Sequence, residues 1–377
     1  MKSVTIWRNL VLPNSETFIA NQIRAMRRWR PVLVGQVAVE NSLGVVPTFT
    51  TLGHRHPLLV RAAARVYRHT GTTPRLHRQF RRSALVHAHF GPDALGIVVA
   101  ARRARRPLVA TFHGYDITMS KEALGIDYTP LFEQASRLVV QSRFIRDELV
   151  RAGAPEEKIH VLPIGIPLPP DPPDAADDGT VLFVGRLVEV KGCGDLLRAV
   201  SGLPETPAVT VIGDGPLRRE LEALASELRV PARFLGSQSP VSVAEAMAKH
   251  TMLCVPSKVA PTGAREGFGM VFLEAAAHRM PVISYASGGI PEAVLDGQTG
   301  LLASEGDVSA LARNIQCVLD DHSLAIRMGA AGRARAEREF NIEKCTSALE
   351  DLYDDVVTRQ RPSPEGPSRR RSGPQRL

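Results

Sequence analysis

The chain has 377 residues, of which 44% are hydrophobic and 23% are charged, a length and composition that predict two globular domains and exclude a disordered protein. Its net charge of +8 is unevenly divided: residues 1–165 carry 24 Lys and Arg against 11 Asp and Glu, whereas residues 166–360 carry 18 against 27. We therefore expect the N-terminal half to meet something anionic, for which nucleic acid and a membrane surface both qualify.

No part of the sequence has the pattern of a membrane-spanning segment. Apolar runs stay well short of the roughly 18 residues that a span requires, and the segment 1–8 is too short and polar for a signal peptide. A cytoplasmic location is therefore expected by default. The cysteines lack C-x-x-C spacing and are expected to be buried, reduced thiols; they are Cys193, Cys254, Cys317 and Cys345.

Strand-like and helix-like segments alternate along the first half of the chain. A first strand is predicted at 4–7, and a helix is predicted from Glu16 toward Trp29. Further apolar runs indicate buried strands at 32–34, 85–89, 108–112, 138–140 and 159–162. This alternation predicts a doubly wound parallel sheet, whose ligands bind beyond the carboxyl ends of the strands. The turns to search for function are therefore those at 9–15, 90–93 and 113–116.

Histidines mark two of these strand ends. His113 leaves a buried strand on a turn that Gly114 allows to be tight, so its side chain is a candidate to face a ligand; the alternative is a local bond to backbone or to Asp116. His87 and His89 share one face of an extended strand. No Cys, Asp or third His is spaced to complete a metal site with them, so no metal is expected.

Arginines crowd three segments of the first half, at 24–30, 75–82 and 102–106. The first was expected on the predicted helix, together with the apolar Met26 and Trp29. A basic, partly apolar surface suits contact with anionic lipid on the inner face of a membrane. The alternative is an ordinary solvated face.

The segment 167–180 is too rich in proline for regular structure and indicates a linker between domains at 1–166 and 181–344. The second domain opens with a buried strand that delivers Arg186 and Lys191 to its carboxyl end. Two cations so placed suit one polyanion, although exposed basic residues are also the norm. The later turn at Gly213 is either structural or lines a ligand pocket.

The segment 256–292 contains the strongest local signal. A predicted strand at 251–255 leads through a Gly-rich turn to an apolar helix at 270–277. The first N–H groups of that helix, near Phe268, Gly269 and Met270, form a candidate anion site. Glu266 is placed on the turn, and Glu274 in an apolar run where a carboxylate needs hydrogen-bond donors. Taken alone, the two are also compatible with ordinary surface glutamates.

Several motifs, in order along the chain, carry a family resemblance. EGFGMVFLE, followed by PVI and GGIPE, resembles the glutamate-x7-glutamate signature of retaining glycosyltransferases of family 4, also called group 1. VGRLVEVKG is similar to the phosphate segment of that family, and the HG-x-D form at 113–116 to its sugar-facing loop. SETFI at 15–19 and HAHFG at 87–91 resemble the exopolysaccharide or colanic-acid branch.

The resemblance implies a GT-B fold, an α/β architecture of two Rossmann-like doubly wound domains facing a central cleft. The domain at 1–166 would bind the acceptor and the domain at 181–344 the nucleotide sugar. A closing helix at 345–360 would cross back to the first domain. The tail at 361–377 is basic and expected to be disordered, since it cannot form a core.

The resemblance also implies roles for individual residues. Arg186 and Lys191 would neutralise the leaving diphosphate, Glu274 would hold the ribose, and His113 would orient the sugar. Glu266 and the backbone of 268–270 would contact sugar hydroxyls. The remaining candidate substrate contacts are Asp116, Gly213 and Gly289.

The implied reaction transfers a hexose from a UDP- or GDP-sugar to a glycan or a polyprenyl or other lipid-linked acceptor, with retention at the anomeric carbon and with neither metal nor cofactor. Cell-surface or exopolysaccharide synthesis is the implied setting. Two departures from the family pattern affect the detail of the donor pocket: Arg279 stands where a glycine is usual before PVI, and Ile164 where an asparagine is common before Gly165.

Two other functions fit the sequence less well. A nucleotide-sugar epimerase can have similar halves, but all of the transferase segments are present. A nucleic-acid-binding protein would use the basic half, but the sequence has no motif of that class and aromatic residues make up only 5% of it.

Overall fold

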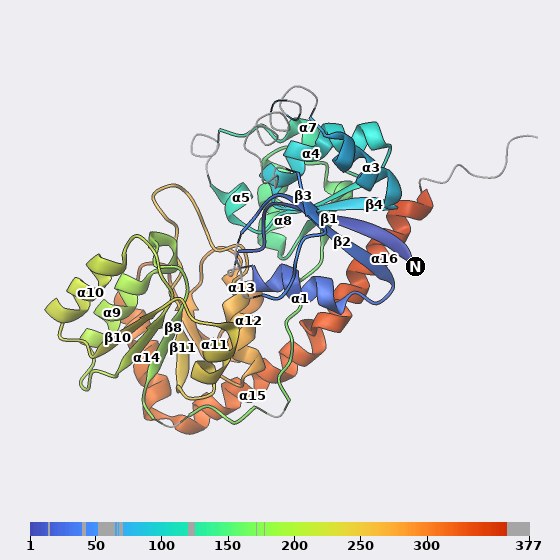
Figure 1. The fold of residues 1–377 in the computed structure, drawn as a ribbon. Helices are drawn as coiled ribbons and strands as arrows, with labels where there is room; N and C mark the ends of the chain where they lie inside the picture. The colour runs from blue at the N-terminus through green and yellow to red at the C-terminus, as the bar shows by residue number, and fades with distance from the viewer. Residues whose placement is uncertain are drawn as a thin grey trace, which may run out of the picture.

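Two parallel β-sheets, one in each half of the chain, organise the fold of the computed structural model (Figure 1), which describes residues 1–13, 16–39, 43–51, 65, 67, 71–119, 125–170, 172–176 and 178–359. Helices cover both sheets. The α/β class expected from the alternation of apolar segments is therefore confirmed.

Among the described residues the first sheet has seven strands, all paired in parallel, in the order β3-β2-β1-β4-β5-β6-β7. Its strands are β1 (Lys2–Val11), β2 (Trp29–Ala38), β3 (Phe49–Thr50), β4 (Leu85–His89), β5 (Leu108–Thr111), β6 (Arg137–Val140) and β7 (Ile159–Val161). The helices of this half are α1 (Thr17–Ala25), α3 (Pro74–Arg82), α4 (Gly91–Ala104), α5 (Tyr115–Thr118), α7 (Thr129–Gln134), α8 (Arg143–Arg151) and the 3-10 turn η1 (Glu156–Lys158).

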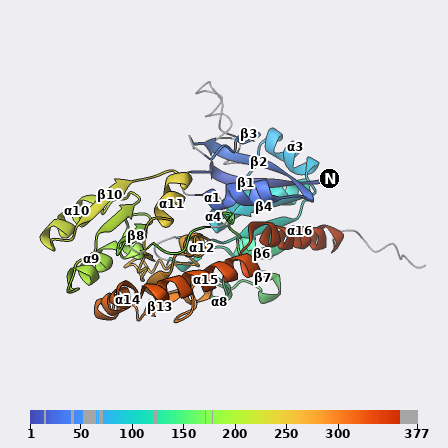
Figure 2. The same cartoon turned by 90° about the horizontal axis from the view of Figure 1, so that it is seen from below.

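Both faces of the first sheet are covered, which explains why every residue of β4 and β5 is buried, without alternation. Phe80 and Phe112 belong to the core on one face, and Ile6 and Trp29 to the core on the other. The second of these cores is completed from the far end of the chain by α16 (Ile342–Arg359), which Figure 2 shows alongside the first sheet. Its contributing side chains are Leu349, Leu352, Tyr353 and Val356.

The second sheet has six parallel strands in the order β10-β9-β8-β11-β12-β13 within the described part of the chain. Its strands are β8 (Val181–Val184), β9 (Val209–Ile212), β10 (Ala232–Gly236), β11 (Met252–Cys254), β12 (Val282–Tyr285) and β13 (Gly300–Ala303). The helices are α9 (Cys193–Ser201), α10 (Arg218–Glu227), α11 (Pro240–Met247), α12 (Met270–Ala277), α13 (Ile290–Ala293), α14 (Val308–Asp320), α15 (His322–Glu339) and the 3-10 turn η2 (Glu189–Lys191).

Each sheet has one point where the strand order reverses, between β1 and β4 in the first and between β8 and β11 in the second. Ligands of doubly wound sheets bind at such a point, beyond the carboxyl ends of the two strands. In the second domain these ends lead into the loop that carries Arg186 and Lys191 and into the loop that carries Glu266. The topology therefore brings three predicted site residues to one place.

The chain crosses between the domains twice, and the two crossings lie side by side. Ile166 forms an isolated bridge with Asn341, and its N–H donates to the Phe340 carbonyl at 2.8 Å. Gly165 makes this approach possible, because a Cβ there would lie 2.5 Å from Cα of Ile342. The second crossing leads directly into α16.

The proline-rich segment 167–180 contains no helix or strand among its described residues, in keeping with its composition. The basic tail at 361–377 lies outside the described residues. In the part of the chain that is described, no helix is long and apolar enough to cross a membrane.

The first helix is shorter than the sequence predicts. α1 ends at Ala25, and Trp29 is the first residue of β2. The bend between them is held from α16, where one carboxylate oxygen of Glu350 accepts from the N–H groups of Arg27, Arg28 and Trp29 at 3.0, 2.8 and 2.9 Å. A partner more than 300 residues away thus ends the helix.

The apolar side chains predicted to be part of a lipid-binding surface at this segment are not exposed. Met26 and Trp29 are buried in the core. The Arg28 guanidinium binds α16, with its Nη2 at 2.7 Å from Asp351 and its Nη1 at 3.3 Å from Asp354. The thiol prediction is wrong at one position: Cys317 is exposed on α14, whereas the other three cysteines are buried and free.

Candidate active site

The two loops at the switch point of the second sheet meet through an ion pair. Lys191 Nζ contacts Glu266 Oε2, and both side chains are mostly buried, at 21% and 15% exposed. Ser257 Oγ lies 3.4 Å from the same carboxylate oxygen. Arg186, by contrast, is exposed, and its side chain has no partner among the described residues. The fold therefore holds the Lys191 side chain in place, whereas the Arg186 side chain remains available to bind a ligand.

The start of α12 lies next to Glu266. The helix begins at Met270 after Gly269, whose φ of +86° is in the left-handed region that favours glycine. No side chain caps this end, so its first N–H groups are available to an anion. The Phe268 side chain is buried and packs edge-on against Phe340 with ring centroids 5.6 Å apart. Only the backbone of Phe268 is therefore available to a ligand.

Glycines allow the surrounding turns to approach one another. A Cβ at Gly289 would lie 2.0 Å from the Gly267 carbonyl oxygen, and the Gly289 N–H donates to the carbonyl of Glu266 at 3.0 Å. A Cβ at Gly213 would lie 1.9 Å from the carbonyl oxygen of Gly185, in the loop of Arg186. The structure thus places both predicted glycines as supports of the loops that carry the charged residues.

Glu274 lies one helical turn into α12 and is partly buried. Burial raises the pKa of its carboxyl to about 7. Among the described residues none donates a hydrogen bond to the Glu274 carboxylate. A carboxylate in such surroundings is stabilised by any ligand that brings hydroxyl donors.

On the facing domain, His113 lies in a group of rings at the end of β5. Its Nε2 is 3.1 Å from Nδ1 of His89, and its ring packs on Phe90 and Phe18 at centroid distances of 4.4 and 4.9 Å. Burial, with the nearby positive charge of Arg8, keeps the pKa of His113 well below its ordinary value. The imidazole is therefore neutral at physiological pH.

Asp116 holds the His113 loop in shape. It is fully buried, and its oxygens accept from the N–H groups of Gly91, His113 and Gly114, each at 2.9 Å. Burial raises its carboxyl pKa to about 6 even though these bonds favour the charged form. Its contact with substrate remains a prediction.

A buried ion triad beside His113 was not predicted from the sequence. The Arg8 guanidinium, which stacks on Phe90 at 4.1 Å, is paired with both Glu16 and Asp93. Glu16 lies in SETFI and Asp93 just beyond HAHFG, so the two motifs that carried the branch resemblance meet here. A signal was available: Arg8 interrupts a strand whose neighbours are apolar, and a buried arginine requires acidic partners.

The two domains touch through these same loops. A Cβ at Gly114 would lie 3.1 Å from Cα of Gly267, and Ser142 Oγ donates to the Gly267 carbonyl at 2.7 Å. The Glu292 carboxylate, at the end of the GGIPE motif, accepts from the N–H groups of Arg143 and Phe144 at 2.8 Å each, at the start of α8. The His113 loop therefore faces the Glu266 loop directly across the domain boundary.

Both ring nitrogens of His87 on β4 already have partners. His87 is occupied on both nitrogens, by Tyr353 of α16 at 2.5 Å and by Thr111 at 2.6 Å. Within the described ranges no three His, Cys, Asp or Glu side chains are grouped to hold a metal ion.

Comparison with known proteins identifies the family of the chain. Residues 14–168 match the family described as Glycosyltransferase Family 4, and residues 169–335 the family described as Glycosyl transferases group 1. The GDP-mannose-dependent alpha-(1-6)-phosphatidylinositol monomannoside mannosyltransferase of Mycolicibacterium smegmatis is 33% identical over 265 residues, which are 64% of this chain and 68% of that protein. The putative colanic acid biosynthesis glycosyltransferase WcaL of Escherichia coli K12 is 30% identical over 284 residues, which are 70% and 69% of the two chains.

The fold is shared with HepE of Anabaena, whose crystal structure contains UDP and glucose. The two are 19% identical with a TM-score of 0.78, over 94% of this chain and 100% of that chain. The family resemblance and the two-domain GT-B architecture predicted from the sequence are thereby confirmed. The chain belongs to the group 1, or family 4, glycosyltransferases.

Proposed function

We propose that the protein is a retaining hexosyltransferase that moves a hexose from a nucleotide-diphosphate sugar to a glycan or lipid-linked acceptor during cell-surface polysaccharide synthesis. The observation that carries this proposal is the contact of Lys191 with Glu266 beside the uncapped start of α12. The names of the relatives, which include a mannosyltransferase and a colanic acid enzyme, support the class of donor and product.

Charge on the departing diphosphate would be neutralised by Lys191, Arg186 and the first N–H groups of α12. Because Lys191 is already held by Glu266, its ammonium group is oriented before the donor binds. Donors fixed in advance are the arrangement in which electrostatic stabilisation of a transition state is strongest. Arg186, which is exposed, would close on the diphosphate when it arrives.

The sugar would be positioned from both domains. Glu266 and the backbone of 268–270 would bind its hydroxyls on one side, and the neutral imidazole of His113 would bind them on the other. In the structure the Gln141 amide lies 3.4 Å from Nδ1 of His113, and a sugar hydroxyl would take its place. Glu274 would accept two hydrogen bonds from the ribose diol. Asp116, Gly213 and Gly289 would act through the loops that they hold.

Neither carboxylate is assigned the nucleophile role of a retaining glycosidase. Glu266 is committed to Lys191 and Ser257, which suits positioning better than attack. In the proposed reaction the acceptor hydroxyl approaches the face from which the phosphate departs. The phosphate oxygen takes the hydroxyl proton, so no metal or cofactor is required.

The test is a donor screen with the full-length protein. UDP-glucose, UDP-galactose and GDP-mannose are added singly, thermal stabilisation is followed, and the product of the active donor is examined by NMR for its anomeric configuration, with and without EDTA. Replacement of Lys191 by Met or of Glu266 by Ala should abolish most transfer while leaving the fold intact. Near-normal turnover in either variant would overturn the assignment of that residue to the site. An inverted product would overturn retention, and inactivation by EDTA would overturn metal independence.

The two other functions find no support in the comparisons, since both matched families are glycosyltransferases. Contact with an anionic membrane on its cytoplasmic face remains part of the proposal, but not through α1. The α3–α4 basic face supports it instead, that is, the arginines of the contacting helices α3 and α4 and of the two residues that follow α4: Arg75, Arg78, Arg81, Arg82, Arg102, Arg103, Arg105 and Arg106. Flotation with anionic vesicles at physiological salt tests this contact, and absence of flotation would refute it.

A further inference from the structure

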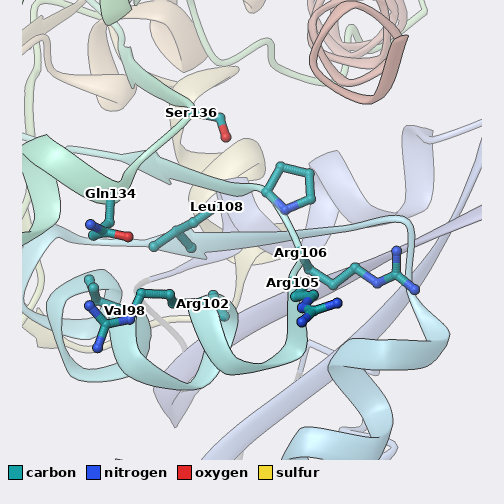
Figure 3. A pocket seen from close by; sticks show the side chains of 9 residues that line it. Val98, Arg102, Arg105, Arg106, Leu108, Gln134 and Ser136 are labelled. Atoms are coloured by element: carbon teal, nitrogen blue, oxygen red, sulfur yellow. The ribbon is translucent and has the colours of Figure 1, made fainter. Parts of the chain in front are cut away.

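A cavity of about 350 Å³ lies in the first domain, at the edge of the sheet opposite the His113 loop. It is bordered by the last turn of α4, the start of β5 and the residues that precede β6, so it lies at the amino ends of the strands. Figure 3 shows Arg102 on α4 and Arg105 just beyond the end of that helix, with Gln134 and Ser136 on the other side of the cavity. The lining residues are Val98, Ala101, Arg102, Arg105, Arg106, Pro107, Leu108, Gln134 and Ser136.

The charge on this cavity is entirely positive, because three arginines and no acidic residue line it. Arg102 and Arg105 are exposed, and within the described part of the chain neither has an ionic or hydrogen-bonding side-chain partner. Arg106 donates from Nη2 to the Arg81 carbonyl at 2.8 Å, but its Nε is buried with no acceptor. Guanidinium groups left without a carboxylate are suited to an anion from outside the protein.

The acids of neighbouring elements do not neutralise this charge. Asp355 of α16 is committed to Arg137 at 2.9 Å and to Arg359 at 2.6 Å. Glu133 precedes Gln134 in sequence but does not line the cavity. The positive charge extends instead onto α3, where Arg78 and Arg82 are exposed.

The arginine side chains are not needed to cap the C-terminus of α4. Its last carbonyls are already satisfied by backbone, since Arg105 N–H donates to Arg102 O at 3.0 Å and Arg106 N–H to Ala101 O at 3.1 Å. Arg105 has a φ of +53°, a position where glycine is the least strained residue. Its guanidinium is therefore not needed to end the helix.

We propose that this cavity binds a phosphate group, at a site separate from the donor diphosphate. The forks of Arg102 and Arg105 and the Ser136 hydroxyl supply donors of the kind that phosphate oxygens accept. The Gln134 amide adds another. The site does not depend on the proposed transferase activity, because it shares no residue with it.

The ligand is a phosphate monoester or free phosphate, and the two sources differ in what else they bring. A lipid headgroup with a terminal phosphate would hold the α3–α4 basic face against a membrane. A soluble phosphate would bind to the cavity alone.

The experiment compares two variants with equal loss of charge. In Arg102→Gln/Arg105→Gln the cavity loses two guanidinium groups; in the matched control, Arg78→Gln/Arg82→Gln, the same face loses two that do not line it. Isothermal titration with inorganic phosphate, at ionic strength held constant with sodium chloride, gives the dissociation constant of each. We expect saturable binding to the wild type, a loss of about tenfold or more in the cavity variant, and a change within about twofold in the control.

Absence of saturable phosphate binding to the wild type would overturn the proposal, as would equal losses in the two variants. Circular dichroism, which should be unchanged, shows that the variants are folded. Vesicles of phosphatidylcholine with phosphatidic acid, compared with phosphatidylcholine alone, separate the sources. Binding that needs phosphatidic acid and the cavity arginines, and that free phosphate reverses, identifies a lipid headgroup; phosphate binding without vesicle recruitment identifies a soluble ligand.

Discussion

The proposed contact of Glu274 with the ribose predicts that the affinity of the protein for its nucleotide sugar rises with pH, because only the ionised carboxylate has both oxygens free to accept from the two hydroxyls. Burial raises the pKa of this carboxyl from 4.5 to about 7. At pH 6 roughly one tenth of the free protein has the ionised form and at pH 8 roughly nine tenths. If the donor binds that form alone, its dissociation constant should fall by about tenfold between the two pH values, equivalent to about 1.4 kcal/mol.

Isothermal titration with UDP-glucose and with GDP-mannose between pH 6 and 8 measures this change. The diphosphate of a nucleotide sugar is esterified at both ends and does not itself titrate in this range. Repeating the titration in buffers of different ionisation enthalpy at pH 7 should reveal proton release on binding. His113 does not contribute, since burial keeps its pKa well below its ordinary value.

The control is Glu274→Gln, which accepts hydrogen bonds at any pH and keeps Asp116, whose pKa is about 6. Its donor affinity should be weaker at pH 8 and nearly constant with pH. If donor affinity changes with pH as steeply in the variant as in the wild type, the assignment of Glu274 to the ribose is refuted. The stability of the free protein should change in the opposite sense: a raised folded-state pKa stabilises the fold below about pH 4.5, and this contribution is lost as pH rises through 7.

Three further predictions follow from contacts in the structure. Gly289→Ala, whose Cβ would lie 2.0 Å from the Gly267 carbonyl oxygen, should displace the Glu266 loop and weaken donor binding by about tenfold or more in a titration. His89→Phe removes the partner of His113 and should lower kcat by about tenfold with little change in Tm. Glu350→Ala leaves three amide donors without their carboxylate and should cost about 2–4 kcal/mol in urea unfolding.

Two of these predictions have a matched control variant. Gly202→Ala adds a Cβ no closer than 3.6 Å to its neighbours and should bind donor normally. Asp351→Ala removes an exposed partner of Arg28 and should cost less than about 1 kcal/mol; an equal cost in the two acid variants would show that the Glu350 bonds are unimportant. A His89→Phe enzyme with normal kcat would remove that histidine from the positioning of His113.

The parts of the fold that depend on local sequence were predicted well. The helix expected at 270–277 and the strand at 85–89 have those bounds in the structure, since apolar runs bounded by glycine define a strand, turn and helix locally. Partners distant in sequence were not predicted. Lys191 and Glu266 were expected as separate ligand contacts, and only the strand order β8-β11 makes them neighbours.

The pairing of His89 with His113 was within reach of the sequence. The register of β4 and β5 aligns His89 with Thr111, and two residues further along a strand return to the same face. Period-two alternation, together with this register, therefore places His89 and His113 on one side of the sheet at adjacent strand ends. The sequence did not indicate that His87, on that same face, is taken by Tyr353 of α16, because that contact joins residues 266 positions apart.

The first domain is not complete at the linker, because α16 packs on it from the far end of the chain. The linker composition divides the chain at 167–180, yet the core on one face of the first sheet includes Leu349, Leu352, Tyr353 and Val356. A fragment ending at the linker would expose that face and leave the amide groups of 27–29 without Glu350. It would also remove the Tyr353 hydroxyl from His87. His87 lies on β4 two residues before His89, which contacts His113. The helix that returns from the second domain thus completes the first and supports the strand end that faces the candidate active site.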